Sequence, residues 1–311
     1  MKQSTPPDRS HLSTEKRNPR TMGLHRASVD ECVAMMQRED KEAVQAVKRA
    51  GKRLSRFISA AEPGFVAGGR LVYVGAGTSG RLGVLDASEA PPTFCVPPGR
   101  VVGIIAGGDG ALRKSSEGAE DDPRGAWPEL AALSLNASDA VIAIAAGGTT
   151  PYALGVFEFC AGLPEGGRPV TALLCCVQGE APPGCDHVIS LRTGPEALTG
   201  STRLKAGTAT KLALNTISTT LMVRSGRVYE NLMVDVRATN EKLRDRAARI
   251  IGTLTGLSRA ECFALLERAG GEVKTAVVMH RLGADAAGAR AQLDAAGGRL
   301  GEALGETTSG A

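Results

Sequence analysis

The stretch Leu71-Val-Tyr-Val-Gly-Ala-Gly-Thr-Ser-Gly80 decides the fold, because it joins an apolar run directly to a glycine loop. Residues 71–74 are apolar and rich in β-branched and aromatic side chains, which predicts a buried strand. The loop Gly75–Gly80 follows at once, and a helix-like segment comes after it. A strand that passes through a glycine loop into a helix is typical of the first unit of a parallel α/β sheet.

Four further short runs resemble residues 71–74 in composition, and helix-like stretches lie between most of them. They are Val101–Ala106, Ala140–Ala146, Val170–Val177 and His187–Leu191. This alternation predicts an α/β fold, in which a five-stranded parallel sheet is covered by helices on both faces through right-handed crossovers. Hydrophobic residues make up 42 % of the chain and aromatic residues only 3 %, so the core must consist of Ala, Val, Leu and Ile.

The segments on either side of this sheet are expected to be helical. Apolar residues recur at helical spacing over residues 28–58 and predict two helices, broken near the polar run Gln37–Asp40. A long helix is expected over residues 206–223. Residues 1–11 are polar and predict a disordered tail, so the α/β domain would span residues 12–239.

Residues 240–311 predict a separate helical subdomain built from several short helices. Its expected breaks are at Gly256, at Gly270-Gly271 and at Gly297-Gly298. Ser258 with Glu261 three residues later is the pattern of a capping box, and Asp285 could cap the next helix. We therefore expect a small helical bundle at the C-terminal end of the chain.

The charge pattern and the cysteine count exclude several classes of protein. The 37 basic and 33 acidic residues give a formal net charge of +4, and no basic stripe with interleaved aromatics indicates a nucleic-acid surface. The seven cysteines are odd in number and form no C-x-x-C pair, which speaks against a disulfide framework and a metal site. Free thiols are typical of a reducing compartment, and no apolar run is long enough to cross a membrane. The sequence therefore predicts a cytoplasmic protein with no nucleic-acid or membrane partner.

The glycine loop has two interpretations. It matches G-x-G-x-x-G, which is typical of a dinucleotide site, but the acidic partner would have to be Asp109, and two glycines separate that residue from the second strand. The alternative is a phosphate site, in which Gly77, Thr78 and Ser79 bind an anion together with free N–H groups at the helix start. Either hydroxyl could instead only cap the helix.

A second hydroxyl-rich loop strengthens the phosphate interpretation. Gly147-Gly-Thr-Thr-Pro151 follows the third strand as Gly75–Gly80 follows the first, and it supplies Thr149 and Thr150. The carboxyl ends of parallel strands meet at one edge, where open α/β sheets bind their ligands. We therefore expect one phosphorylated small molecule to lie between the two loops.

Five segments closely resemble the N-acetylmuramic acid 6-phosphate etherases, which are members of the sugar isomerase (SIS) superfamily. They are Val72–Phe94, Glu117–Asp121, Gly194–Ala209, Asn231–Asn240 and the N-terminal Thr14–Pro19. The resemblance extends from Leu12 to Leu304. It implies an SIS-type three-layer α/β sandwich with a helical C-terminal region, usually assembled as a homodimer, and no metal or organic cofactor.

The resemblance also implies the chemistry and its residues. The family cleaves the lactyl ether of N-acetylmuramic acid 6-phosphate to N-acetylglucosamine 6-phosphate and D-lactate, by C2 proton abstraction, elimination and addition of water. Its two functional glutamates fall on Glu89 and Glu120. Glu117 and Glu120 are expected on one helix face, so spacing cannot choose between them and only the resemblance selects Glu120.

Other positions near the expected site carry further expectations. Ser201, Thr202 and Lys205 lie near a predicted helix start and are candidates to bind the substrate phosphate or hydroxyls, although Lys205 could also be an ordinary surface lysine. The loop after the third strand departs from the family. Gly147 stands where the family usually has Ser, and Thr149 stands where it usually has Arg.

Three alternative functions stay open on the sequence. A sugar-phosphate isomerase would share the fold and the C2 proton abstraction, whereas a non-catalytic sugar-phosphate regulator would keep the loops without needing both glutamates. A nicotinamide-binding enzyme is the third. Retention of Glu89 and Glu120 favours catalysis, whereas Gly147 and Thr149 leave the regulator open.

Overall fold

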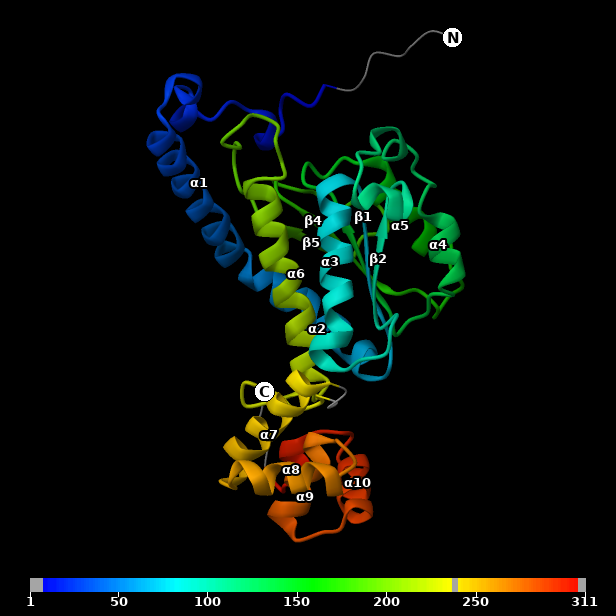
Figure 1. Cartoon of the computed structure of the whole chain (residues 1–311). Coiled ribbons are helices and arrows are strands. Elements are labelled where there is room, and N and C mark those ends of the chain that lie inside the picture. The colour runs from blue at the N-terminus through cyan, green and yellow to red at the C-terminus, as the bar shows by residue number, and fades with distance from the viewer. Residues whose placement is uncertain (1–7, 237–239, 307–311) are drawn as a thin grey trace. The chain divides into compact units, whose positions relative to one another are not determined.

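The chain forms two compact units, and the computed structural model describes residues 8–236 and 240–306 (Figure 1). The first unit contains the described residues up to Ser88 together with Gly99–Ser218. The second contains Glu89–Pro98 and the described residues from Thr219 onward. The second unit therefore begins before residue 240, the boundary suggested by the sequence. Most of the tail expected over residues 1–11 lies outside the described residues.

The first unit is built on a five-stranded parallel sheet, as the sequence predicts. Its strands are β1 (Leu71–Gly75), β2 (Val101–Ile105), β3 (Ala140–Ile144), β4 (Val170–Cys175) and β5 (His187–Ser190). The strand order is β2-β1-β3-β4-β5, and all neighbouring strands are parallel. The chain moves from β1 to β2 on one side and then to β3 on the other side of β1. A reversal of this kind opens a crevice at the carboxyl ends of the strands, where ligands bind.

Two helices cover one face of the sheet, α4 (Trp127–Ala132) and α5 (Pro151–Ala161). Leu130 and Val156 from these helices share a buried cluster with Val72, Val141 and Leu173 of the central strands. Strand residues of opposite parity point to the other face, because side chains alternate along a strand. The sheet is buried on both faces, as expected of a parallel sheet.

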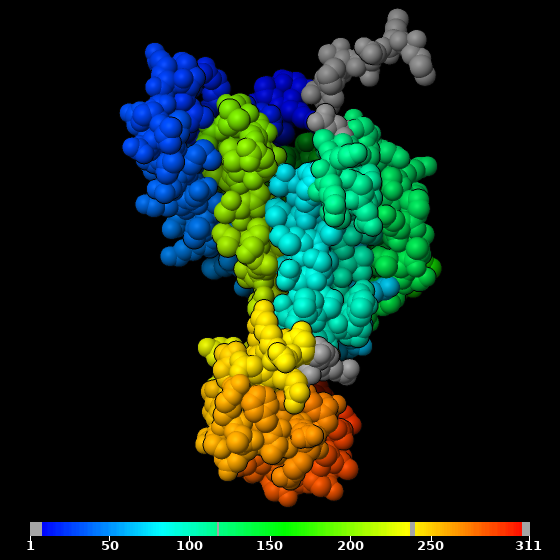
Figure 2. All heavy atoms as spheres, viewed as in Figure 1, coloured from blue at the N-terminus to red at the C-terminus, as the bar shows by residue number. Residues whose placement is uncertain are grey.

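The opposite face is covered by α2 (Gly51–Val66), α3 (Gly77–Phe94) and α6 (Lys205–Arg224), which completes the predicted three-layer sandwich. The Phe57 ring on α2 contacts the His187 ring of β5 with centroids 5.8 Å apart. A Cβ on Gly83 of α3 would lie 2.9 Å from the Cβ of Tyr73 on β1, so only glycine lets α3 lie this close to the sheet. Figure 2 shows α3 and α6 side by side, with the blue α1 next to α6.

The expected break near Gln37–Asp40 is wrong, because α1 (Val29–Arg49) continues through this polar run. The two N-terminal helices meet at Ala50 instead, which links α1 to α2. Glu39 stays helical and buried because it forms ion pairs with Arg20 and Lys205, so an apolar residue is not needed at this turn. Three short 3-10 helices precede α1, at Ser13–Glu15, Pro19–Thr21 and Leu24–Arg26.

The second unit is a bundle of short helices with a two-stranded antiparallel ribbon. Its elements are β6 (Val228–Tyr229), β7 (Leu232–Met233), α7 (Glu241–Thr255), α8 (Arg259–Arg268), α9 (Val273–Leu282), α10 (Ala286–Ala295) and α11 (Leu300–Ala303). The predicted capping box at Ser258 is present, and Asp285 accepts a hydrogen bond from the N–H of Gly288 at 2.7 Å. The glycines of the three predicted breaks all have positive φ, which confirms them as helix ends.

Candidate active site

The loop between β1 and α3 has the geometry of an anion site. Gly77 has a φ of 52°, and a Cβ on Gly80 would lie 2.6 Å from the Gly75 carbonyl oxygen, so glycine is needed at both positions. Thr78 and Ser79 follow in the first turn of α3 and are partly exposed. N–H groups in a first helical turn have no acceptor within the helix, and the helix dipole adds partial positive charge there. The loop can therefore hold a phosphate group.

The loop between β3 and α5 offers hydroxyl groups in a similar way. Gly148 has a φ of 71°, and Thr150 has extended backbone angles at the N-cap of α5. The Thr150 side chain makes no capping hydrogen bond at the start of α5, so its hydroxyl is not used to cap this helix. Thr149 is exposed in the same loop.

Glu120 lies between these two loops. Its backbone carbonyl accepts a hydrogen bond of 3.1 Å from the N–H of Tyr152, which follows the second loop in α5. Glu120 also lines a small pocket together with Gly77, Arg81 and Ser116. The structure thus brings together a predicted catalytic residue, the first loop and the start of α5.

Glu120 does not belong to the helix that the sequence suggested. The 3-10 helix η5 (Glu117–Ala119) ends before it, so the expected shared helix face of Glu117 and Glu120 is wrong. Gly118 lies inside this segment and Pro123 follows it, and both residue types oppose an α-helix. A turn therefore carries Glu120.

Arg81 is a site residue that the sequence reasoning missed. Its guanidinium donates hydrogen bonds to the carbonyl oxygens of Leu112, at 3.3 Å, and Lys114, at 3.2 Å. These contacts hold the end of the 3-10 helix η4 (Gly108–Leu112) and the residues directly after it against α3. Its spacing in the sequence could have identified it, because residues four apart lie on one helix face and Arg81 comes four residues after Gly77, a predicted site residue. Asp109, the candidate ribose ligand of a dinucleotide site, is exposed within η4.

The turn before α6 adjoins the first loop. The N–H of Gly207 donates to the Thr202 carbonyl at 2.9 Å, and a Cβ on Gly207 would lie 3.4 Å from the Thr78 methyl group. Ser201 and Thr202 are partly exposed in this turn. These two predicted residues therefore share a neighbourhood with Thr78.

Lys205 is buried at the first turn of α6 and is not a surface lysine. Its side chain is 1 % exposed, and its ammonium group forms an ion pair with the Glu39 carboxylate. Glu39 also accepts hydrogen bonds from Asn18 at 2.8 Å and from Arg20 at 2.6 Å. Burial alone would raise the pKa of Glu39, but the hydrogen bonds from Arg20, Lys205 and Asn18 outweigh it and lower that pKa to about 2. The Lys205 ammonium group is therefore already paired with a protein carboxylate, which it shares with Arg20.

Glu196 is a second carboxylate that the sequence reasoning missed. It is fully buried and accepts hydrogen bonds of 2.9 Å from the backbone N–H groups of Lys205 and Ala206. It therefore caps α6 from nine residues away in the sequence, a distance at which no local capping pattern would identify it. Burial raises the pKa of Glu196, and the backbone hydrogen bonds oppose that effect.

Glu89 is the predicted site residue that lies far along α3 from the first loop. It is exposed on α3, twelve residues after Gly77, and belongs to the second compact unit. At a rise of about 1.5 Å per residue this is roughly 18 Å along the helix axis. Glu89 therefore does not lie beside the loop that begins its own helix.

The described residues offer no metal centre or membrane segment. Within residues 8–236 and 240–306, no three His, Cys, Asp or Glu side chains are grouped so that they could hold a metal ion. No helix in that part of the chain is both long enough and apolar enough to cross a membrane. The seven cysteines are free, and burial raises the pKa of Cys160 and Cys176 to about 12.

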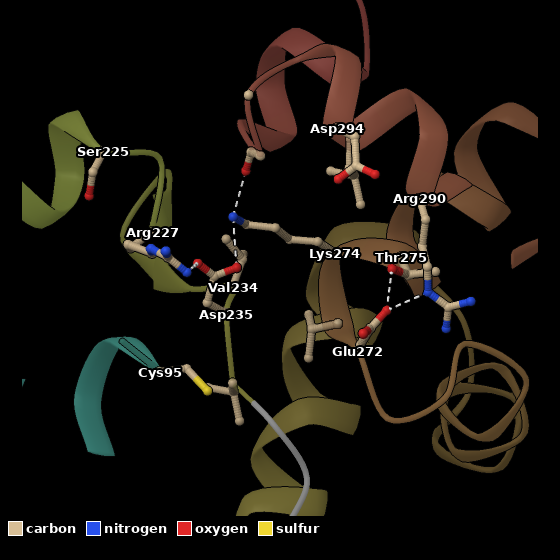
Figure 3. Close-up of a pocket in the computed structure, with 15 residues that line it drawn as sticks. Cys95, Ser225, Arg227, Val234, Asp235, Glu272, Lys274, Thr275, Arg290 and Asp294 are labelled. Carbon is tan, nitrogen blue, oxygen red and sulfur yellow. Dashed lines mark hydrogen bonds and ion pairs between the residues drawn. The ribbon is translucent and has the colours of Figure 1, made fainter. Parts of the chain in front are cut away.

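The second unit has a pocket of its own, lined by paired charges (Figure 3). The ammonium group of Lys274 donates to the carbonyls of Gly226, at 2.8 Å, and Gly298, at 2.6 Å, and pairs with Asp235 at 2.7 Å. Asp235 also pairs with Arg227 at 2.8 Å. Burial lowers the pKa of Lys274, against the opposing effect of Asp235. Lys274 thus joins the beginning and the end of the unit.

Curated proteins resemble this chain over nearly its whole length. An N-acetylmuramic acid 6-phosphate etherase from Gloeobacter violaceus is 52 % identical over 299 residues, which cover 96 % of this chain and 96 % of the relative. This chain belongs to the N-acetylmuramic acid 6-phosphate etherase family. Etherases from Serratia proteamaculans and Salmonella typhimurium are 49 % and 48 % identical, and each match covers 94 % of this chain and 98 % of the relative.

Two family models also match this etherase-family chain. Residues 52–161 match the glucokinase regulatory protein N-terminal SIS domain, and residues 230–280 match the C-terminal lid domain of glucokinase regulatory protein. Among solved structures, the phosphoheptose isomerase from Neisseria gonorrhoeae is 14 % identical with a TM-score of 0.40, covering 62 % of this chain and 98 % of that protein. A likeness of this strength says nothing about function.

Proposed function

We propose that this chain cleaves the D-lactyl ether of N-acetylmuramic acid 6-phosphate to give N-acetylglucosamine 6-phosphate and D-lactate. The observation that carries the proposal is the identity of 52 % to a curated etherase over nearly the full length of both chains. The geometry supports it, because Glu120 lies between two loops suited to phosphate at the carboxyl edge of the sheet. The free cysteines support a cytoplasmic location.

The reaction needs one group that accepts a proton and one that donates a proton. In the open-chain sugar, the C1 aldehyde acidifies the C2 proton, and the lactyl oxygen on C3 is the leaving group. A carboxylate removes the C2 proton, the C2–C3 double bond forms, and the C3–O bond breaks as a carboxylic acid protonates the departing oxygen. Water then adds at C3 and a proton returns to C2, so the net change is hydrolysis without any cofactor. We assign Glu89 to the ether oxygen and Glu120 as its partner.

The phosphate of the substrate is assigned to the hydroxyl loops. Backbone N–H groups of the first α3 turn from Gly77 onward would donate to its oxygens, together with the hydroxyls of Thr78 and Ser79. Ser201 and Thr202 adjoin Thr78 and would complete this side. Thr149 and Thr150 would contact the ligand from the second loop, as expected for a site at the crevice.

The active form is proposed to be a homodimer in which a second copy supplies Glu89. The support is the position of Glu89, which is exposed and about 18 Å along α3 from Gly77. Such a separation exceeds the reach of one glutamate side chain. A two-fold symmetric pair of chains would bring Glu89 of one copy to the loops of the other in both sites at once.

The proposed function is tested by incubating the purified chain with N-acetylmuramic acid 6-phosphate and assaying D-lactate. Release of lactate from the phosphorylated sugar, with little from N-acetylmuramic acid itself, is expected. Equal release from both sugars would contradict the phosphate assignment. Absence of lactate with either sugar would contradict the etherase proposal.

A non-catalytic sugar-phosphate regulator is the second candidate, and the matches to glucokinase regulatory protein domains favour it. Such a protein would bind a sugar phosphate at the same loops without turnover. Binding of N-acetylmuramic acid 6-phosphate without release of D-lactate would identify this function.

A further inference from the structure

A polar cluster lies where three parts of the first unit meet; Glu39, Lys205 and Asn18 in it are buried, whereas the Arg20 side chain is half-exposed. It consists of Glu39 on α1, Lys205 at the start of α6, and Asn18 and Arg20 in the N-terminal segment; we call it the Glu39 cluster. Arg20 reaches the two carboxylate oxygens with two hydrogen bonds, of 2.6 and 2.9 Å. Figure 2 shows the blue α1 and the yellow-green α6 side by side. The mechanism proposed above uses none of these contacts.

The Glu39 cluster ties the N-terminal segment to the loop that precedes α6. The Asn18 amide that donates to Glu39 also donates to the Pro195 carbonyl at 3.2 Å. The Thr21 hydroxyl donates to the Ala197 carbonyl at 2.8 Å. The segment therefore holds the backbone of residues 195–197 in place from one side.

The same loop continues into the turn that touches the phosphate site. The N–H of Gly200 donates to the Thr14 carbonyl at 3.2 Å, so the N-terminal segment also holds the residue before Ser201. Beyond this turn, Gly207 lies against the Thr78 methyl group. A shift of Lys205 would therefore move Ser201 relative to Thr78.

The charges of the cluster point to a positional role more than to a large gain in stability. Buried ion pairs often contribute little net stability, because desolvation of the charges offsets their attraction. Hydrogen-bonded charges do, however, restrict geometry more tightly than apolar contacts. Glu39 on α1 accepts hydrogen bonds from the N-terminal segment and forms an ion pair with the start of α6, and these contacts define the mutual placement of the three segments.

We infer that Glu39 and Lys205 are positioning residues that hold the turn before α6 against Thr78, so that Ser201 and Thr202 face the substrate phosphate. In this assignment the Lys205 ammonium group binds Glu39 and does not bind the phosphate. The inference rests on the proposed sugar-phosphate site. It does not require that the bound sugar is cleaved.

The test compares Glu39→Gln and Lys205→Met with a matched buried pair elsewhere in the first unit. Asp139 is buried and pairs with Arg70 at 2.6 Å. Both residues lie at the amino ends of β1 and β3, at the edge of the sheet opposite the loops. Asp139→Asn therefore removes a comparable buried charge without touching the proposed site.

Binding of N-acetylglucosamine 6-phosphate to the full chain is measured by calorimetry, and the melting temperature is measured for each variant. Glu39→Gln and Lys205→Met should each weaken binding about 10- to 100-fold, the loss expected when one or two charge-assisted contacts are misplaced. The double variant should have about the same affinity as the single variant that binds the sugar phosphate less tightly, because the two residues act as one unit. Asp139→Asn should lower the melting temperature but change binding by less than about threefold.

Two results would overturn the inference. One is a binding loss in Glu39→Gln no larger than in Asp139→Asn, at a temperature where both proteins are folded. The other is full additivity of the two single losses in the double variant. If Glu39→Gln does not fold, Glu39→Asp is used instead, because it keeps the charge on a shorter side chain. An intermediate loss of affinity is then expected, and unchanged affinity would contradict the inference. If the unmodified chain binds the sugar phosphate but releases no lactate, only the etherase proposal fails.

Discussion

At the scale of single residues, the site depends on side chains whose surroundings come from distant parts of the chain. The backbone carbonyl of Glu120 accepts a hydrogen bond from the N–H of Tyr152, and Glu120 shares a pocket with Gly77. Lys205 was expected at the ligand, yet it pairs with Glu39, a residue 166 positions away in the sequence. The residue type indicates what a side chain can do, whereas its neighbours decide what it does.

Glu120→Gln and Glu89→Gln should each reduce lactate release by about 10²- to 10⁴-fold, because Gln keeps the shape but cannot exchange a proton. Binding of the sugar phosphate should change far less than turnover. Glu158→Gln is the control, since Glu158 is 61 % exposed in a surface pair with Arg124 and should leave activity unchanged. Near-normal lactate release from both Glu89→Gln and Glu120→Gln would contradict the proposed mechanism, in which these two carboxyl groups transfer the protons.

Gly147→Ser should lower the KM of the phosphorylated substrate. One added hydrogen bond to a charged group contributes about 1.5–3 kcal/mol, or roughly ten- to a hundredfold in affinity. A Cβ at this position would lie 3.2 Å from a methyl carbon of Leu12, so the tip of that side chain must move slightly. The double variant Gly147→Ser, Leu12→Ala relieves this contact. An unchanged KM in both variants would show that Thr149 or Thr150 already fills this role.

At the scale of helices and strands, local sequence signals were reliable where an element is stabilised by its own hydrogen bonds and by its own apolar pattern. The five strands, the long α6 and the Ser258 capping box are where the sequence predicts them. One error falls where a polar residue pairs with a distant partner. The run Gln37–Asp40 looked like a helix break because its stabilising contacts come from Arg20 and Lys205.

Lys274→Met should destabilise the second unit. Removing the ammonium group leaves Asp235 with Arg227 alone and leaves the carbonyls of Gly226 and Gly298 without this donor. Breaking a buried pair by removing one partner typically costs about 3–5 kcal/mol. Urea unfolding of the full chain should show an earlier transition for this variant. Arg249→Met is the control, because its pair with Asp245 is on the surface and should matter little.

Glu39 should make the stability of the first unit depend on pH in the acid range. Its pKa is lowered in the folded chain from its ordinary value of 4.5 to about 2, so the unfolded chain binds the proton more readily. The stability that Glu39 contributes is therefore present above pH 4.5 and is lost as the pH falls toward 2. Thermal melting followed across this range should be less dependent on pH in Glu39→Gln. An equally steep dependence in the variant would contradict the assignment.

At the scale of the whole molecule, the two glutamates proposed for catalysis are grouped in different compact units. Glu120 and the loops belong to the first compact unit, whereas Glu89 is grouped with the second. We propose that a second copy of the chain supplies Glu89, so that the enzyme would be active only as a dimer. The proposal can be tested without a structure of the dimer.

Mixing Glu89→Gln with Glu120→Gln should restore activity if each site uses both chains. After dissociation and random reassociation, half of the dimers carry both variants, and one of the two sites in such a dimer is intact. Lactate release should then recover to about one quarter of the unmodified level. Mixing each variant with itself is the control. A mixture that forms dimers by size-exclusion chromatography but stays inactive would show that each site lies within one chain.

The sequence by itself determined the architecture, because it depends on local and periodic features. Runs of apolar residues, glycine loops and helix caps act over a few residues, so the five parallel strands, the three layers and the hydroxyl loops could be predicted. The long motifs around Glu89 and Glu120 were also sufficient to identify the etherase family.

Only the tertiary structure decided which of these residues meet. It put Glu120 between the loops, buried Lys205 against Glu39, and revealed Glu196, whose partners are not marked by any local spacing. The physical reason is that hydrogen bonds and ion pairs act over a few ångströms in space, whereas sequence patterns report only neighbours along the chain.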